Sequence, residues 1–424
     1  MSVELAEPDA RALFRPEILA EPHAFLKSLR LSAPVTHVTS PDGQEMFVVT
    51  SYALIEEASR RAADFSSNFG HMLITGGGDP EVEAILKQDY IQPALLLISD
   101  DPEHKRYRAL VNAVFAMGRI GNMAPIIERL VDELIDDFIE KGEVDFVNEF
   151  AILLPTYVIA DILGLPRNRY KKVREWSDSI ISIVSRMGTR DQQIAAAHHV
   201  VEFRQFILKT IKERREQRSD DLISYLIDVR VEGFPPLTDE EIAPLAVELS
   251  VAGNETTRNT LMSGMARLIN RHPDQLEAIR QDPSLINNAV EELLRYETPA
   301  TSMWRIATRD TQLGGVDIPA GSAVLLRFDA GNRDEAKFEN PDEFDIRRKN
   351  ARLHQSFGGA NIHRCLGQML ARKEMQIAFP KLFARLQNLR VIEEGSDTDY
   401  WPGLLHRGIG ALRLGFTPGP KVNG

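Results

Sequence analysis

The residue with the most distinctive chemistry in this chain is its only cysteine. Cys365 lies in the stretch SFGGANIHRCLGQMLARKEM, which begins at Ser356. Glycines at 358 and 359 let the backbone approach a flat ligand closely, and Gly367 allows a tight turn. The helical pattern LGQMLARKEMQIAF follows directly, so we expect the sulfur at a helix N-terminus. There, free N–H groups and the helix dipole stabilise a thiolate, the form of cysteine that binds metal.

A single thiolate restricts the kind of metal centre. Zinc ribbons and iron–sulfur clusters need several soft ligands, and the chain has no second cysteine. One thiolate as the sole protein ligand suits haem iron. The alternative is that a lone cysteine is simply a small buried apolar residue. The glycine-rich loop before Cys365 favours the metal-binding interpretation.

A polar run interrupts a long predicted helix. Thr238 and Glu241 are placed as a capping box, and no strong stop follows before Pro273. This gives roughly 33 residues and about 50 Å of helix, enough to cross a domain. Midway, the apolar stripe gives way to AGNETT at 252–257. A buried hydroxyl or carboxyl without a partner costs about 1–3 kcal/mol, so the run indicates a cavity with water or ligand; exposure to solvent fits the periodicity equally well.

Charged groups elsewhere are spaced so that they can act together. Glu292 and Arg295 are three residues apart in a predicted helix and can pair. His104 and Arg108 are four apart in another helix, and Arg305 falls in a probable strand. If these basic groups converge, they can bind the carboxylates of an anion, since a guanidinium binds a carboxylate bidentately. Taken singly, each group is also what a solvated surface contains.

The composition limits the class of protein. The 424 residues are 43% hydrophobic and 26% charged, which are ordinary globular values. The net charge of −12 argues against general nucleic-acid binding. The first residues lack the basic and apolar regions of a signal peptide, and no apolar run approaches the ~18 residues of a membrane span. We therefore expect a cytoplasmic protein without a membrane anchor.

Most of the chain has helical periodicity, with a few short strands. Alternation on both sides of Asp42-Gly43 predicts a hairpin followed by a helix. Apolar spacings of three and four predict helices over 124–142 and 199–217, and short strands are expected in 313–328 and in GALRLGF. The stretch 66–100 predicts a long, partly ordered loop that covers a pocket. Without repeats or linkers, we expect one helix-rich domain over 1–424.

Together these motifs resemble the cytochrome P450 family over nearly the whole chain. The resemblance implies a mainly α fold with small β-sheets, with haem b between a long central helix and the cysteine-ligand helix. Four motifs carry it in the family's order: AGNETT at 252–257, ELLR at 292–295, the spaced set Phe338, Pro341, Phe344 and Arg348, and HRCLG at 363–367.

The resemblance also implies residue roles. Cys365 would ligate the iron, while Thr256 and Glu255 would deliver protons to dioxygen. The residues that would contact haem are His104, Arg108, Ala252, Gly253, Arg305, Phe357, Gly358, His363 and Gly367; of these, His104, Arg108, Arg305 and His363 would hold the propionates. The residues that would contact substrate are Val247, Ala252, Ser302, Met303 and Leu404. The structural set would be Glu292, Arg295 and Arg348.

The cysteine loop departs from the family pattern at one point. The family has phenylalanine seven residues before the cysteine and glycine four before it, where this chain has Gly358 and Asn361. Phe357 stands one place too early, as though the loop carried one extra residue. Either the loop bulges and keeps Phe357 beside the sulfur, or the thiolate is less shielded. The second case would change its electron donation and the iron's potential.

The implied activity is that of a monooxygenase. It would insert one atom of dioxygen into a small, largely hydrophobic organic substrate, by hydroxylation or oxidative demethylation. Electrons would come from a ferredoxin and its NAD(P)H-dependent reductase, docked on a basic patch made by Lys105, Arg106, Arg364, Arg372 and Lys373.

Two alternatives to this activity remain. One is a peroxide-driven or non-oxygenating haem-thiolate enzyme, against which the intact Glu255-Thr256 pair argues. The other is a haem-thiolate sensor, for which the sequence offers no effector module.

Overall fold

The computed structural model describes residues 9–41, 43–70, 79–87, 95–116, 122–165, 167–185, 189–392 and 399–422. These residues group into two compact units. The first unit comprises Met1–Ser67, Val131–Ala151 and Thr256–Gly424, and the second comprises Asn68–Leu130 and Ile152–Glu255. The single domain expected over 1–424 stays a prediction.

The first unit contains the strands and a set of mostly short helices. Its strands are β1 (Val35–Thr39), β2 (Glu45–Val49), β3 (Phe65–Ser66), β4 (Glu143–Asp145), β5 (Ser302–Ala307), β6 (Thr311–Leu313), β7 (Val316–Ile318), β8 (Ala323–Arg327), β9 (Gln387–Val391) and β10 (Arg413–Thr417). Its α-helices are α1 (Pro16–Ala20), α2 (His23–Ser32), α3 (Tyr52–Arg60), α15 (Pro273–Gln281), α16 (Ile286–Glu297), α17 (Phe328–Gly331) and α18 (Gln368–Arg385). Short 3-10 turns η1 (Ala10–Phe14), η4 (Pro283–Leu285) and η5 (Ala351–Leu353) and a π-helical turn (Val147–Ala151) complete it.

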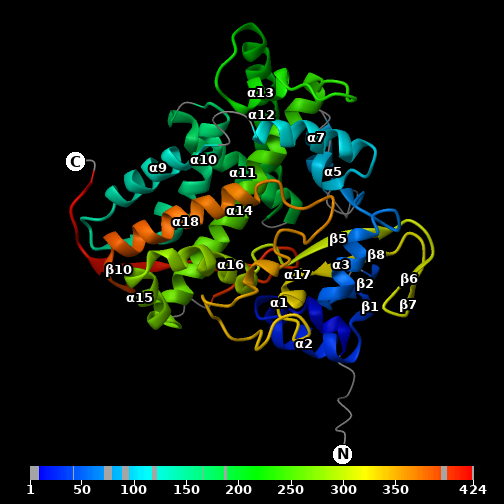
Figure 1. The fold of residues 1–424 in the computed structure, drawn as a ribbon. Helices are drawn as coiled ribbons and strands as arrows, with labels where there is room; N and C mark the ends of the chain where they lie inside the picture. Colours follow the sequence, from blue (N-terminus) through cyan, green and yellow to red (C-terminus); the bar gives the residue numbers. More distant parts are fainter. Residues whose placement is uncertain are drawn as a thin grey trace, which may run out of the picture. The chain divides into compact units, whose positions relative to one another are not determined.

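The main sheet joins segments that are far apart in the sequence. Its strand order is β1-β2-β8-β5-β3, with β2 and β8 parallel and the other neighbours antiparallel. Figure 1 shows this mixture as blue N-terminal strands beside yellow strands from the later part of the chain. The predicted hairpin is confirmed, and Gly43 in its loop has φ +83°, a value that favours glycine.

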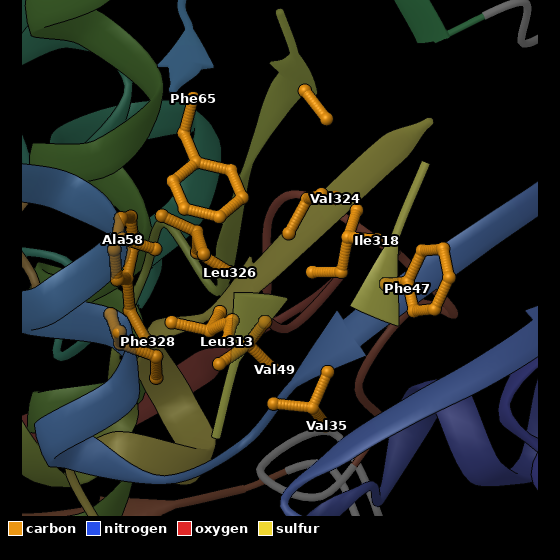
Figure 2. Packing of buried hydrophobic residues seen from close by; sticks show 12 residues of the cluster. Val35, Phe47, Val49, Ala58, Phe65, Leu313, Ile318, Val324, Leu326 and Phe328 are labelled. Atoms are coloured by element: carbon orange, nitrogen blue, oxygen red, sulfur yellow. The ribbon is translucent and has the colours of Figure 1, made fainter. Parts of the chain in front are cut away.

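Apolar side chains from both segments form the core against this sheet. Val35, Phe47 and Val49 of the hairpin belong to the same cluster as Val324 and Leu326 of β8 (Figure 2). Each is less than a tenth exposed. Full burial of such a side chain stabilises the fold by about 1.5–3 kcal/mol. The cluster therefore fixes β8, and with it the adjacent strand β5, which carries Arg305.

The second unit is helical. Its helices are α5 (Pro80–Lys87), α6 (Leu95–Ile98), α7 (Glu103–Phe115), α10 (Leu153–Ile162), η3 (Arg167–Arg169), α11 (Tyr170–Ser185), α12 (Arg190–Glu216) and α13 (Leu222–Asp228). Helices α11 and α12 pack along each other, with Trp176 stacked on Phe203 at 4.7 Å between ring centroids. Helix α12 begins before the predicted position 199 because Thr189 and Gln192 form a capping box.

The prediction of one long loop over 66–100 is wrong for part of that stretch. Residues 80–87 form α5, and 95–98 form α6. Val82 and Ile85 of α5 pack with Ala197 of α12, so tertiary burial stabilises a helix where neighbouring glycines suggested a loop. The rest of the predicted loop over 71–78 and 88–94 lies outside the described residues.

Two helices belong to both units because the division falls within them. Helix α9 (Ala124–Asp136) accounts for much of the predicted helix over 124–142, and Gly142 follows at φ +74°. Helix α14 (Asp239–Asn270) is the predicted long central helix, with 32 residues. The Thr238 backbone N–H donates to Glu241 Oε2 at 2.9 Å, which is one half of the predicted capping box. No helix in the described parts of the chain is both long enough and apolar enough to cross a membrane.

Candidate active site

The loop that carries Cys365 folds back on itself in the first unit. The Cys365 backbone N–H donates to the Phe357 carbonyl at 2.9 Å, and the Gly358 N–H donates to the Gln355 carbonyl at 2.7 Å. Gly358 and Gly359 have φ of +87° and +72°, which residues with a Cβ rarely adopt. The result is a turn-rich loop on which Cys365 is exposed.

Helix α18 begins two residues later than predicted. Leu366 and Gly367 form a turn, and the first helical residue is Gln368. The expected helix start directly after Cys365 is therefore wrong, because the backbone needs this turn before the first helical hydrogen bond, from Ala371 to the Gly367 carbonyl. Asn361, which occupies the family's glycine position, accepts the His363 N–H through its side-chain oxygen at 2.6 Å.

Phe357 contacts the cysteine through its backbone while its ring packs elsewhere. The ring centroid lies 5.4 Å from that of His354, and the Arg372 guanidinium lies over the ring at 4.4 Å. The extra loop residue is thus accommodated by a bulge at the two glycines. The Phe357 backbone therefore lies beside that of Cys365 while its ring contacts His354 and Arg372, and the choice between the two alternatives for shielding of the sulfur stays a prediction.

A buried carboxylate behind the loop organises these contacts. Glu291 of α16 accepts two hydrogen bonds from Arg372 of α18, at 2.6 and 3.0 Å. His354 Nε2 lies 3.2 Å from the same carboxylate, and its Nδ1 accepts the Ser356 N–H at 3.1 Å, so Nε2 carries the ring proton. Burial would raise the pKa of Glu291, but the hydrogen bonds from His354 and Arg372 outweigh it and lower that pKa to about 2.

The Glu291 network was missed by sequence analysis, and it corrects one prediction. Arg372 is 7% exposed and ion-paired, so it is not available for the basic docking patch proposed from the sequence. The signal that could have been used is the pair of adjacent glutamates at 291 and 292 in one helix. Adjacent helical residues point in different directions, so two buried glutamates need two separate basic partners.

The second of these glutamates has the partners that the sequence suggested. Arg295 is fully buried and donates to Glu292 at 2.7 and 2.8 Å, and Arg348 donates to Glu292 at 3.1 Å. Arg295 also donates to the carbonyls of Asn332 and Pro341 at 2.8 and 2.9 Å. The alternative of an exposed surface pair does not apply, because both side chains have no exposed area. Removing one partner of such a buried pair costs about 3–5 kcal/mol.

Strand β5 brings three of the predicted site residues into the first unit. Arg305 is 4% exposed and donates to the Trp304 carbonyl at 2.6 Å. Ser302 is fully buried and donates to the Leu404 carbonyl at 2.7 Å, so two of the predicted substrate contacts touch each other. Met303 packs against the core cluster of the main sheet.

Helix α7 holds two predicted residues in the second unit. His104 is 2% exposed, with Nδ1 3.7 Å from the Asp101 carboxylate, and Arg108 is half-buried one turn later. Burial lowers the pKa of His104, and the charge of Asp101 opposes this effect. The ring is therefore mainly a neutral donor and acceptor at pH 7.

The middle of α14 contains a gap in an otherwise buried helix. Ile242, Leu245 and Ala246 have no exposed area, whereas Ala252 and Gly253 are exposed. A Cβ added to Gly253 would meet no atom within 4 Å, so there is open space beside the backbone. We name this segment, residues 252 and 253, the α14 notch.

The polar residues after the notch are not simply solvated. Asn254 is 8% exposed and donates to Ser177 Oγ at 3.2 Å, while Thr257 is buried and Glu255 and Thr256 are half-buried. The Thr260 hydroxyl donates to the Thr256 carbonyl at 2.9 Å, a bond that tends to bend a helix. The alternative that this polar run faces solvent is therefore excluded for two of its residues, Asn254 and Thr257.

One further residue of α14 was missed by sequence analysis. Glu248 accepts the backbone N–H groups of Leu96 and Leu97 at 3.0 and 2.9 Å, so it caps the first turn of α6. Val247, a predicted substrate contact, is half-buried beside it. A glutamate among apolar residues of a buried helix was the available signal.

Each unit by itself presents a surface that fits part of a haem site. The first unit offers one exposed thiol on a loop that contains Gly358. Because this residue has no Cβ, no side chain crowds the backbone of His363 and Arg364 next to the cysteine. The second offers an exposed, small-residue notch that a side chain would partly fill. An exposed thiol and an open notch in a helix are the chemistry and the space that a haem-thiolate centre requires.

Comparison with known proteins identifies the family. The family model Cytochrome P450 matches residues 36–404. The steroid C26-monooxygenase of Mycobacterium tuberculosis is 33% identical over 404 residues, which cover 95% of this chain and 95% of that protein. The 6-deoxyerythronolide B hydroxylase of Saccharopolyspora erythraea is 36% identical over 389 residues, covering 91% and 93%. The chain belongs to the cytochrome P450 family.

The fold agrees with this assignment. The solved structure of cytochrome P450 CREJ in complex with (4-ethylphenyl) dihydrogen phosphate superposes with a TM-score of 0.86 at 30% identity, covering 94% of this chain and 98% of that one. The mainly α fold with small sheets is confirmed. The protein is a cytochrome P450 monooxygenase, and members of this family bind haem b.

Proposed function

We propose that this protein uses Cys365 as the protein ligand of the haem iron and inserts one atom of dioxygen into a small, largely hydrophobic substrate, by hydroxylation or oxidative demethylation. The observation that carries the proposal is that the chain's only cysteine is exposed on a loop, where its backbone N–H is fixed by the Phe357 carbonyl. Haem, when bound, supplies the redox chemistry that activates dioxygen. The remaining requirements fall on the chain's own residues.

Residues around the thiol hold it in place. The Phe357 carbonyl, the bulge at Gly358 and the turn at Gly367 fix the backbone on both sides of Cys365. In the first unit, Arg305 and His363 are the groups proposed for the haem propionates, since charged and N–H donors bind carboxylates well. In the second unit, His104 and Arg108 offer the same chemistry.

Proton delivery is assigned to Thr256 and Glu255. The Thr256 hydroxyl lies one turn after the α14 notch and is half-buried, so it can hold a water or a protonated oxygen near the notch. Glu255 carries the titratable group that exchanges protons with solvent. Asn254 is held on Ser177, which fixes the rotation of the helix at this point.

The substrate is proposed to be hydrophobic. Two relatives carry the names steroid C26-monooxygenase and 6-deoxyerythronolide B hydroxylase. In this chain the proposed contacts are Val247 and Ala252 on α14, Ser302 and Met303 on β5, and Leu404. The hydroxyl of Ser302 is already bonded to Leu404, so its part is to hold the Leu404 segment in place.

Electrons are proposed to come from a ferredoxin and its NAD(P)H-dependent reductase. Arg364, directly before the cysteine, and Lys373 on α18 are both exposed. Arg352 is 76% exposed and reaches within 3.9 Å of Glu291, the partner of Arg372. Arg352 therefore takes the place of Arg372 in a basic surface that can attract an acidic electron carrier.

The test is the coupling of electron use to product in the reconstituted system. Thr256→Ala should keep NAD(P)H oxidation but lower the yield of hydroxylated product per NAD(P)H by about a hundredfold, the lower end of the range for one proton-transfer group. Thr256→Ser, which keeps the hydroxyl, is the matched control and should stay coupled. Unchanged coupling in Thr256→Ala, or full turnover by wild type with peroxide alone, would contradict the proposed oxygen chemistry.

A further inference from the structure

A cavity in the first unit lies among side chains to which neither the haem nor the substrate has been assigned. Its volume is about 180 Å³. This is larger than a cavity that can hold a benzene ring. Its lining comes from the start of α2, the end of α14, the end of α16, the turn after α17 and the segment 399–412: Glu21, His23, Ala266, Arg267, Arg271, Tyr296, Arg333, Tyr400 and Arg407.

Positive charge dominates this lining. Four guanidinium groups line the cavity, and three of them, on Arg267, Arg333 and Arg407, pair with three carboxylates, of which one is buried. The buried one is Glu297, which accepts from Arg267, from Arg407 at 3.0 Å and from the Tyr400 hydroxyl at 2.9 Å. The other two, Glu21 and Asp342, are more than half exposed, so solvent screens them. A net positive charge therefore remains in the cavity.

The arginines are held rigidly before any ligand arrives. The Arg407 guanidinium lies 3.3 Å from the ring centroid of Tyr400. The guanidinium groups of Arg333 and Arg267 lie 3.6 and 4.2 Å from the ring centroid of Tyr296. Stacked guanidinium groups lose little further freedom when an anion binds, which favours affinity.

Three residues of the cavity lining also have buried nitrogens with no hydrogen-bond partner among the residues that the structure describes. Arg333 and Arg407 are 7% and 4% exposed, and the Nε of each is buried without a hydrogen-bond partner. Both ring nitrogens of His23 are likewise buried without partners. Burial, then the charges of Arg333 and Arg407, holds the pKa of His23 well below its ordinary value, so the ring is neutral and carries one N–H. These nitrogens have almost no accessible surface, so the accessible parts of the guanidinium groups that line the cavity, and not these nitrogens, are what a ligand would contact.

We propose that this cavity binds a small oxyanion of the phosphate class, either inorganic or carried by a small phosphate ester. Phosphate oxygens match the fork of a guanidinium, and three or four such groups surround a single space here. The volume leaves room for a diphosphate or a short ester. Carboxylates fit the charge less well, because one carboxylate offers two acceptor oxygens to several donors. The site is independent of the proposed oxygen chemistry.

The test is calorimetric titration of the haem-loaded protein with inorganic phosphate, pyrophosphate and glycerol 3-phosphate in chloride buffers of matched ionic strength. We expect saturable binding at one site for at least one of the three. Tightest binding of glycerol 3-phosphate would indicate a phosphate ester as the ligand, and tightest binding of phosphate or pyrophosphate would indicate a free anion. Arg271→Glu should weaken this binding by roughly tenfold or more, because it replaces a charged donor with a like charge to the ligand. Arg271 is exposed, so the variant should fold.

The matched control is Arg347→Glu, an equal charge change at an exposed arginine outside the cavity lining. It should alter affinity by no more than about twofold, as expected of a screened surface charge. Three results would overturn the site: no saturable heat with any of the three anions, equal weakening in both variants, or unchanged binding in Arg271→Glu. Each can be recorded on protein with an intact haem spectrum, so failure here is distinct from failure of the proposed monooxygenase chemistry.

Discussion

The Glu291–Arg372 pair gives the sharpest quantitative prediction. Linkage between a pKa near 4.5 in the unfolded chain and about 2 in the folded protein makes the Glu291 carboxylate worth about 3 kcal/mol at neutral pH. Direct removal of one partner of a buried pair costs about 3–5 kcal/mol, which agrees. Because the folded pKa is the lower one, this stability is present above about pH 4.5 and is lost as the pH falls toward about 2.

The measurement is urea unfolding of haem-loaded protein at pH 7, followed by circular dichroism. Glu291→Gln and Arg372→Gln should each lower the free energy of unfolding by about 3 kcal/mol. The double variant should lower it by far less than the sum, since neither charge is then left alone in the interior. Arg372→Gln should also lose the contact between the guanidinium and Phe357, worth about 0.5–2 kcal/mol.

The control is Arg352→Gln. Arg352 also approaches Glu291, at 3.9 Å, but it is 76% exposed, so its removal should cost less than about 1 kcal/mol. Additive effects of Glu291→Gln and Arg372→Gln would refute the reasoning. So would a cost in Arg352→Gln as large as that in Arg372→Gln, because burial would then not decide the strength of the pair.

Two further predictions concern stability. Gly253→Ala should stabilise the fold by about 1 kcal/mol of helix propensity and so raise the thermal midpoint, because the added Cβ meets no atom within 4 Å. Gly264→Ala in the same helix should lower the midpoint, because its Cβ would lie 3.0 Å from Leu293 and Phe379. A higher midpoint in Gly264→Ala than in Gly253→Ala would contradict the described packing. Burial raises the pKa of Glu374 to about 8, so the folded protein keeps a proton that the unfolded chain releases, and wild-type stability should fall relative to that of Glu374→Gln as the pH rises from about 4.5 to about 8. Urea unfolding of both proteins at about pH 5 and about pH 8 measures this difference, and an equal change in stability in wild type and Glu374→Gln would contradict it.

Features set by neighbouring residues could be predicted from the sequence. The hairpin after residue 34, the start of the central helix at Thr238 and the cysteine loop all depend on short stretches whose turn and capping residues are adjacent. The roles of the candidate site residues near Cys365 came instead from the resemblance of HRCLG at 363–367 to the family's loop, and they stay predictions.

Features that depend on distant partners could not be predicted. The Glu291–Arg372 pair joins residues 81 positions apart, and the parallel pairing of β2 with β8 places Met46 opposite Ala323. Nothing local specifies either partner. Helix α5 was missed because its burial against α12 outweighs the glycines that precede it. The cation-rich cavity was missed because its lining comes from five separate segments.

The central claim is that the thiolate of Cys365 ligates the haem iron. The most direct measurement is the carbon monoxide difference spectrum of the reduced, haem-loaded protein, compared with that of Cys365→Ala. The wild type should show the strongly red-shifted Soret band of a thiolate-ligated haem, and the variant should lack it. A red-shifted band that survives in Cys365→Ala, or a wild-type band at the position given by an imidazole ligand, would contradict the account.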